Sequence, residues 1–169
     1  MDTWKFLRAA LLFAMAFCAL AAQAQSLRPF AQQHRAAKAE AVTYLFPEQW
    51  TVAAGKPVWV ALHFRVAPGL HINSHTPADD FLIPTTFSIP AGAGVRLLDA
   101  SYPAGTITVL AADPGTKLSV YAGEFILRVR IEAAAGNHLV EGKLRYQACD
   151  NNQCMPAETA VAVLDVIGR

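Results

Sequence analysis

The stretch Val58-Trp59-Val60-Ala61-Leu62-His63-Phe64-Arg65-Val66 decides the fold of this chain. Branched or aromatic apolar side chains occupy every second position in it, and the residues between them include His63 and Arg65. Successive side chains of a strand point to opposite faces, so this spacing gathers the apolar groups on one face. A period of two that lasts nine residues predicts a half-buried antiparallel strand.

Shorter runs with the same period predict further strands on both sides of this stretch. They occupy residues 42–46, 70–73, 85–89, 95–102, 124–132, 139–148 and 159–166. Turn residues separate them, as at Ala54-Gly55-Lys56-Pro57. Residues 103–117 hold several prolines and glycines, so we expect a long excursion there with at most one short strand.

The number of strands predicts the fold class. About eight or nine short strands, without a long amphipathic helix, are typical of an all-β protein with an immunoglobulin-like antiparallel β-sandwich. The Cys…Trp…Cys spacing of true immunoglobulin domains is absent from the sequence. No internal repeat or second domain is visible, so we expect one domain over residues 41–169.

The N-terminal residues have the pattern of an export signal. Lys5 and Arg8 give a basic start, residues 9–22 form an apolar run, and Ala22-Gln23-Ala24 is a small-x-small cleavage site. Residues 1–24 are therefore predicted to be a cleaved signal peptide. The run is too short for a permanent membrane span, and no later segment approaches the roughly 18 uninterrupted apolar residues that a span needs.

The part that remains after cleavage excludes some classes of function. Residues 25–40 lack strand periodicity and are predicted to be a lead-in segment. The net charge of the whole chain is only +1, so no electrostatic footprint of a nucleic-acid partner is present. Cys18 is expected to leave with the signal peptide, which leaves Cys149 and Cys154 as the cysteines of the mature chain.

These two cysteines lie in the stretch Tyr146-Gln147-Ala148-Cys149-Asp150-Asn151-Asn152-Gln153-Cys154-Met155-Pro156. The four polar residues between them tolerate tight turns, so the two thiols can close on each other. Three interpretations are open: a structural bridge, a redox pair and a metal site. A bridge around so small a loop would contribute only about 2 kcal/mol of chain entropy, which weakens the structural interpretation.

A redox pair needs one sulfur that a partner thiolate can attack and a second sulfur that resolves the mixed disulfide. Asp150 disfavours a thiolate on Cys149, whereas Cys154 stands between two uncharged residues. Cys154 is therefore predicted to be the contact sulfur and Cys149 the resolving sulfur. The residues that flank the pair are Tyr146, Gln147, Asp150, Met155 and Pro156. Pro156 stiffens the exit from the loop.

A metal site would take His71, His75 or Met155 as further ligands, because thiolate and thioether sulfur favour Cu(I). Nothing in the sequence places these residues near the cysteines. The alternative function is thus a non-enzymatic binding or copper-handling domain, in which the cysteines are a structural bridge or metal ligands. No Ser-His-Asp order, carboxylate pair or phosphate loop stands out, and neither a resident metal nor another cofactor is expected.

Three stretches also carry a likeness to a known family. They are Gly69-Leu70-His71-Ile72-Asn73-Ser74 with Pro77 and Phe81-Leu82-Ile83-Pro84-Thr85, then Tyr102-Pro103 with Val120-Tyr121-Ala122-Gly123, and finally Tyr146-Gln147-Ala148-Cys149…Cys154-Met155-Pro156. Over nearly the whole mature domain the chain resembles the N-terminal periplasmic domain of the thiol:disulfide interchange protein DsbD and its stand-alone relatives. The last stretch is the most specific.

The resemblance implies an immunoglobulin-like sandwich that carries out thiol–disulfide exchange in the periplasm, an activity linked to cytochrome c biogenesis. The cysteine pair would pass electrons between thioredoxin-like partners. In the family the second cysteine forms the mixed disulfide and the first resolves it, and these roles map to Cys154 and Cys149. The membrane conduit of the full-length protein is absent from this sequence, so a separate membrane electron donor is implied.

The chain departs from the best-known members of that family in two places. Those members have five residues between the cysteines, and this chain has four. They also cover the disulfide with a cap loop that contains an aromatic residue. The equivalent place here falls within residues 103–119, and this range contains no aromatic residue. Ile107, Val109 and Leu110 are therefore the predicted cap residues.

Overall fold

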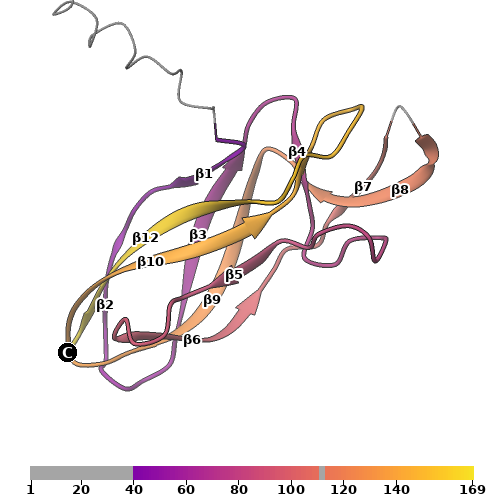
Figure 1. The fold of residues 1–169 in the computed structure, drawn as a ribbon. Coiled ribbons are helices and arrows are strands. Elements are labelled where there is room, and N and C mark those ends of the chain that lie inside the picture. The colour runs from indigo at the N-terminus through magenta and orange to yellow at the C-terminus, as the bar shows by residue number, and fades with distance from the viewer. Residues whose placement is uncertain (1–39, 111–112) are drawn as a thin grey trace, which may run out of the picture. The chain divides into compact units, whose positions relative to one another are not determined.

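The computed structural model describes residues 40–110 and 113–169. In these residues all the secondary-structure elements are β-strands, twelve in number (Figure 1). They are β1 (Val42–Leu45), β2 (Gln49–Val52), β3 (Val58–Val66), β4 (His71–Asn73), β5 (Thr86–Ser88), β6 (Val95–Ser101), β7 (Thr106–Leu110), β8 (Asp113–Tyr121), β9 (Glu124–Ala133), β10 (Gly136–Tyr146), β11 (Ala148–Cys149) and β12 (Glu158–Gly168). The predicted signal peptide at 1–24 and almost all of the lead-in at 25–40 lie outside the described residues and stay predictions.

The strands form three four-stranded sheets. Their orders are β1-β3-β9-β6, β2-β12-β10-β5 and β11-β4-β8-β7. Neighbouring strands are antiparallel except for β2, which pairs with β12 in parallel. The prediction of an all-β fold built from antiparallel sheets is confirmed. None of the described segments forms a helix that could cross a membrane.

A single hydrophobic core joins the first two sheets. On β3 the side chains of Leu62 and Phe64 are fully buried, whereas Trp59 and Arg65 point outward, as the period of two predicts. Across the core, the second sheet contributes the side chain of Leu144 and its neighbours on the same face. The alternation read from the sequence therefore separates core side chains from surface side chains correctly.

The prediction of a long excursion at residues 103–117 is wrong. β7 and β8 form a hairpin there, and β8 continues to Tyr121, where it pairs with β4. The pairing with β7 provides backbone hydrogen bonds that the local sequence does not predict, and the ladder shifts register between Val109 and Leu110, beside the stretch that contains Gly115 and its neighbouring proline. β2 was also not predicted, so the count is twelve described strands rather than eight or nine.

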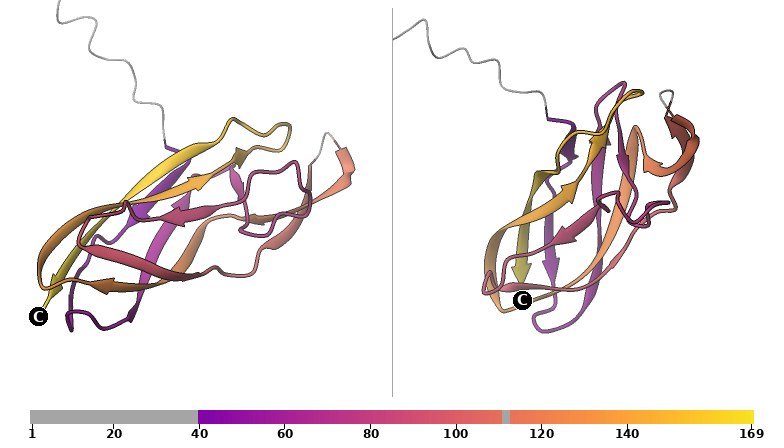
Figure 2. Two further views of the ribbon diagram at one scale, coloured as in Figure 1. Left: turned by 60° about the horizontal axis from the view of Figure 1, so that its bottom comes forward. Right: turned by 45° about the vertical axis from the view of Figure 1, so that its right-hand side comes forward.

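The long β10–β12 ladder leads to the end of the domain that holds both cysteines. These strands pair from Gly136 opposite Gly168 to Tyr146 opposite Glu158. Beyond that last pair the chain continues into the hairpin that contains both cysteines. Both views in Figure 2 place this orange-yellow hairpin and the β7–β8 hairpin at the same end of the domain, away from the C-terminus.

Candidate redox site

The cysteine hairpin begins where the chain changes sheets. β10 ends at Tyr146 in the second sheet, and β11 begins at Ala148 in the third. Gln147 is the single residue between them. β11 pairs with β4, which places Cys149 directly opposite His71. The short strand β4 is therefore the platform on which the cysteine hairpin rests.

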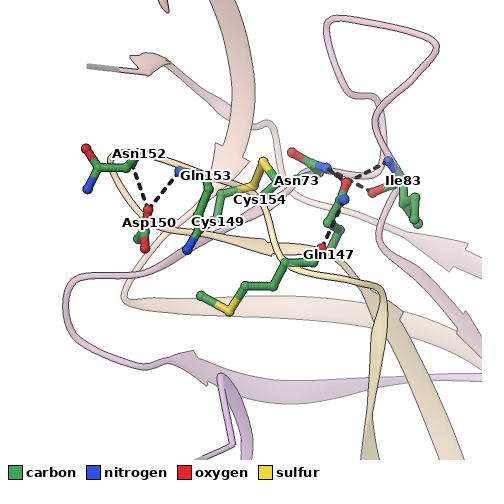
Figure 3. The surroundings of a disulfide bond; sticks show 9 residues. Asn73, Ile83, Gln147, Cys149, Asp150, Asn152, Gln153 and Cys154 are labelled. Atoms are coloured by element: carbon green, nitrogen blue, oxygen red, sulfur yellow. Dashed lines mark hydrogen bonds between the residues drawn. A yellow bond between two sulfur atoms is a disulfide. The ribbon is translucent and has the colours of Figure 1, made fainter. Parts of the chain in front are cut away.

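Cys149 and Cys154 form a disulfide across this hairpin (Figure 3). The two residues are antiparallel bridge partners, and their Cα atoms lie 3.9 Å apart. A backbone hydrogen bond closes each side of the pair. The Met155 N–H donates to the Ala148 carbonyl at 2.7 Å, and the Asp150 N–H donates to the Gln153 carbonyl at 3.0 Å. The hairpin thus holds the two sulfurs together through its own backbone.

Asp150 organises the tip of the hairpin. Its Oδ1 atom accepts the N–H groups of Asn152 at 2.7 Å and Gln153 at 2.8 Å. This is the Asx arrangement that a short polar side chain offers to a tight turn. The two donated hydrogen bonds hold the pKa of the Asp150 carboxyl below its usual value. The carboxylate next to Cys149 is therefore ionised at neutral pH, which is the state that the sequence argument assumed.

The two sulfur-bearing residues differ in exposure. Cys149 is fully buried, with an exposed fraction of 0%, whereas Cys154 is partly exposed. Of the two residues, only Cys154 therefore has surface that is exposed to solvent. Burial and the neighbouring Asp150 charge both disfavour a thiolate on Cys149.

Gln147 ties the hairpin to the loop that follows β4. Its Oε1 atom accepts the Ile83 N–H at 3.2 Å and the Asn73 side-chain N–H at 3.0 Å. Its Nε2 atom donates to the Met155 carbonyl at 3.1 Å. Asn73 in turn donates to the Ile83 carbonyl at 3.2 Å. These bonds, drawn in Figure 3, connect both arms of the hairpin to β4 and to residues near position 83.

The other flanking residues have supporting positions. Tyr146 is buried, and its hydroxyl donates to Glu158 at 3.3 Å. Burial first, and then the Glu158 charge, raise the pKa of Tyr146 to about 12, so the phenol stays neutral. Met155 is partly buried against the core, and Pro156 is exposed. Tyr146 and Met155 therefore anchor the hairpin to the sandwich.

The sequence did not connect His71 with the cysteines, and the structure does. Directly paired residues of antiparallel strands share a face, so the His71 ring lies on the same face of the sheet as the Cys149 side chain. Burial lowers the pKa of His71, while the Asp150 carboxylate acts in the opposite direction. The family-like stretch 69–74 was the signal that marked His71 and Asn73, but it gave no register for β4 and β11.

The His75 ring contacts Tyr102 and Thr85. Its ring stacks on Tyr102 at 3.8 Å between centroids, and its Nδ1 atom lies 2.9 Å from the Thr85 carbonyl oxygen. Within residues 40–110 and 113–169, no three His, Cys, Asp or Glu side chains are grouped so that they could hold a metal ion. His71 lies opposite Cys149 and His75 does not, so the copper-handling interpretation stays a prediction.

The predicted cap residues lie on β7. Ile107 and Val109 are 60% and 50% exposed. The strand register links His71 and Asn73 through Val120 to Thr106, so Thr106 and Thr108 share the face of the disulfide, and Ile107 and Val109 belong to the opposite face. Thr106, Ile107 and Thr108 all line a hollow together with His71 and Asn151. A covering role for Ile107, Val109 and Leu110 stays a prediction.

Residues 41–165 match the family described as thiol:disulfide interchange protein DsbD, N-terminal. The chain belongs to the DsbD N-terminal family. The resemblance inferred from the three sequence stretches is thereby confirmed, and membership supports a thiol–disulfide exchange domain with Cys149–Cys154 as its disulfide. No curated protein matches the chain.

Two solved structures of N-terminal domains are similar to this chain. The N-terminal periplasmic domain of ScsB from Proteus mirabilis has 16% identity and a TM-score of 0.51, with 73% of this chain and 44% of that chain covered. The reduced DsbD N-terminal domain of Neisseria meningitidis has 17% identity and a TM-score of 0.43, with 64% and 77% covered. This chain thus spans less than half of the ScsB domain. The first likeness shows the shared fold, an immunoglobulin-like sandwich as predicted.

Proposed function

We propose that this chain is a periplasmic thiol–disulfide exchange protein that passes electrons between thioredoxin-like partners through Cys149 and Cys154. The observation that carries the proposal is the asymmetry of the disulfide. It lies in a hairpin at one end of the sandwich, with Cys154 partly exposed and Cys149 fully buried. Exchange requires one sulfur that a partner can reach and one that only the chain's own sulfur can reach.

The reaction begins with the oxidised chain and a partner dithiol. A partner thiolate attacks the Cys154 sulfur, the Cys149–Cys154 bond breaks, and Cys149 leaves as a thiolate that takes up a proton. The second partner thiol then attacks the mixed disulfide and releases Cys154 as a thiol. Two electrons and two protons have moved, because the partner dithiol has become a disulfide and the chain holds two thiols.

The return reaction uses the same sulfurs in the opposite order. The Cys154 thiolate attacks the disulfide of a second thioredoxin-like partner, and one partner sulfur leaves as a thiol after protonation. Cys149 then gives up its proton and attacks the Cys154 sulfur, which restores the disulfide, and the partner sulfur leaves and takes up a proton to complete the partner dithiol. Cys149 never needs to meet a partner in this scheme, which agrees with its burial. In the proposed setting a separate membrane protein supplies the electrons, and the segment 1–24 directs export.

Single-cysteine variants test these roles. We expect Cys149→Ala to form a mixed disulfide about tenfold or more faster than Cys154→Ala, because only Cys154 is accessible. The probe is a thioredoxin-like domain that retains one active-site cysteine, activated as its thionitrobenzoate disulfide. Release of thionitrobenzoate and a non-reducing gel follow the reaction. Equal rates, or a faster Cys154→Ala variant, would contradict the assignment.

A double Cys149→Ala/Cys154→Ala chain is the control that should give no adduct. The wild-type chain, equilibrated with glutathione buffers, separates exchange from a structural bridge. An exchange disulfide should have a reduction potential above about −300 mV. A lower reduction potential, together with no adduct from Cys149→Ala, would contradict the exchange proposal.

A further inference from the structure

A buried oxygen without a partner lies beside the disulfide. Asn73, on β4, has an exposed fraction of 0%, and its Oδ1 atom has no hydrogen-bond partner. A buried amide oxygen without a donor destabilises the folded state, so such a group in a native site requires an explanation. A donor that exists in only one redox state of the protein would provide that explanation.

The orientation of this amide is fixed by its neighbours. Gln147 Oε1 must be an oxygen, because it accepts the Ile83 N–H, and Gln147 Nε2 must be the nitrogen, because it faces the Met155 carbonyl. The Asn73 side-chain nitrogen then donates both to Gln147 Oε1 and to the Ile83 carbonyl. Turning the Asn73 amide over would set oxygen against oxygen at both contacts. Its Oδ1 atom is thus held as an acceptor.

The strand register places Asn73 on the same face of the sheet as Cys149. Asn73 lies two residues beyond His71 on β4, and His71 is directly opposite Cys149. Asn73 and Cys149 are therefore diagonal neighbours on one face of the sheet, at a spacing of about 7–8 Å between backbones that side chains can bridge. Figure 3 shows the Asn73 oxygen on the side of its amide that is turned toward the two sulfurs.

A disulfide has no hydrogen to donate, whereas a thiol has one. In the oxidised chain the Asn73 oxygen is accordingly left without a donor. His71 Nε2 is also buried without a partner, but a ring nitrogen can be either a donor or an acceptor. The Asn73 oxygen accepts only, so its state depends on whether the neighbouring sulfur carries a proton.

We propose that the side-chain oxygen of Asn73 accepts the S–H hydrogen of reduced Cys149 and so holds the resolving cysteine as a neutral thiol. Reduction of the disulfide adds two electrons and two protons, and one of those protons stays on Cys149 in this hydrogen bond. The bond stabilises the reduced chain relative to the oxidised chain. It leaves Cys154 as the sulfur that ionises and attacks, so the proposal rests on the exchange function above and explains how its two roles are kept apart.

Asn73→Leu tests the proposal, because leucine has a similar volume and no acceptor. A hydrogen bond to the neutral form raises a thiol pKa, so we expect the Cys149 pKa, measured in the Cys154→Ala background, to fall by about one unit. In the chain with both cysteines, the equilibrium with glutathione should shift about tenfold toward the disulfide, which corresponds to about 30 mV. The two titratable groups next to Cys149, Asp150 and His71, are kept in every variant.

Thr85→Val is the matched control. The Thr85 hydroxyl donates to the backbone carbonyl of Asn73 and leaves the side-chain oxygen untouched. A structural role for this region would make both variants less stable and shift neither the thiol pKa nor the glutathione equilibrium. We expect Thr85→Val to behave in that way and Asn73→Leu to shift both quantities. Unchanged values in a folded Asn73→Leu chain would overturn the proposal.

The S–H stretching band of Cys149 gives a measurement that needs no substitution at Asn73. In the Cys154→Ala chain this Raman band should lie at the lower frequency of a hydrogen-bonded thiol, and a band at the free-thiol frequency would overturn the proposal. The result is independent of the exchange function. Trapping by Cys149→Ala together with a free S–H band would remove the Asn73 role alone, whereas a shifted band without trapping would remove the exchange function alone.

Discussion

His71 lies opposite Cys149, and burial lowers its pKa from 6.5. The unfolded chain then binds a proton more readily than the folded chain, so the contribution to stability is complete above pH 6.5 and is lost as the pH falls toward the folded pKa. We expect the midpoint of urea denaturation to decline below pH 6.5, and His71→Gln to remove part of that decline. His63→Gln, on β3 away from the disulfide, is the matched control and should keep it. Equal declines in the wild type and His71→Gln would contradict the prediction.

At the scale of residues, the sequence identified the two cysteines and their unequal charge environments, because Asp150 directly follows Cys149. It could not find the roles of His71 and Asn73 at the site. Their positions depend on the register of β4 against β11, and the two strands are separated by many residues in the sequence. No local pattern encodes such a register. The polarity of the Asn73 amide likewise depends on Gln147 and Ile83, which come from two other segments.

At the scale of elements, two hydrogen bonds to the titratable carboxylate of Asp150 hold the tip of the cysteine hairpin. The pKa of Asp150 is lowered from 3.8 because its carboxylate accepts the N–H groups of Asn152 and Gln153. Because the pKa is lowered, these two hydrogen bonds are fully formed above pH 3.8 and are lost as the pH falls through the pKa that Asp150 has in the folded chain. We expect the amide proton shifts of Asn152 and Gln153 to titrate together, with a midpoint below 3.8, in an NMR pH series.

Asp150→Asn keeps an acceptor oxygen and removes the ionisable group. In that variant the two amide shifts should stay near their neutral-pH positions throughout the series. A common midpoint at or above 3.8 in the wild type, or a titration that persists in Asp150→Asn, would show that another group controls the turn.

Elements with a long period of two were predicted well, and elements held by distant partners were not. β3 and β9 have alternating buried and exposed residues over nearly their whole length, so each reveals its own face. β8 contains a proline and a glycine, and it is a strand because β4 and β7 lie on either side of it. β2 has only four residues and depends on its parallel partner β12. Local propensity underestimates strands of this kind.

For the molecule as a whole, the core between the first two sheets should dominate stability. Leu144 is fully buried in that core, so Leu144→Ala should lower the free energy of unfolding by about 2–5 kcal/mol. Leu139 lies on the same strand but is 76% exposed, and Leu139→Ala is the matched control, with an expected change within about 0.5 kcal/mol. Urea denaturation measures both. Similar losses would mean that the core is not where the alternation places it.

The sandwich was predictable as a class because strand count and alternation are local properties. The third sheet was not, since β4, β8 and β11 are brought together by pairings between distant parts of the chain, and only β7 and β8 are neighbours in the sequence. The cysteine hairpin belongs to that third sheet. The sequence therefore predicted the β-sandwich and the two cysteines, but it did not predict that the cysteine hairpin pairs with β4.

The single residue Gln147 separates the last strand of the sandwich from the first strand of the cysteine hairpin. The hairpin closes on itself through Ala148–Met155 and Asp150–Gln153 backbone bonds. Its tip can therefore gain or lose a residue without moving a core strand. The length and the sequence of the tip can then change while the strands of the three sheets keep their pairings.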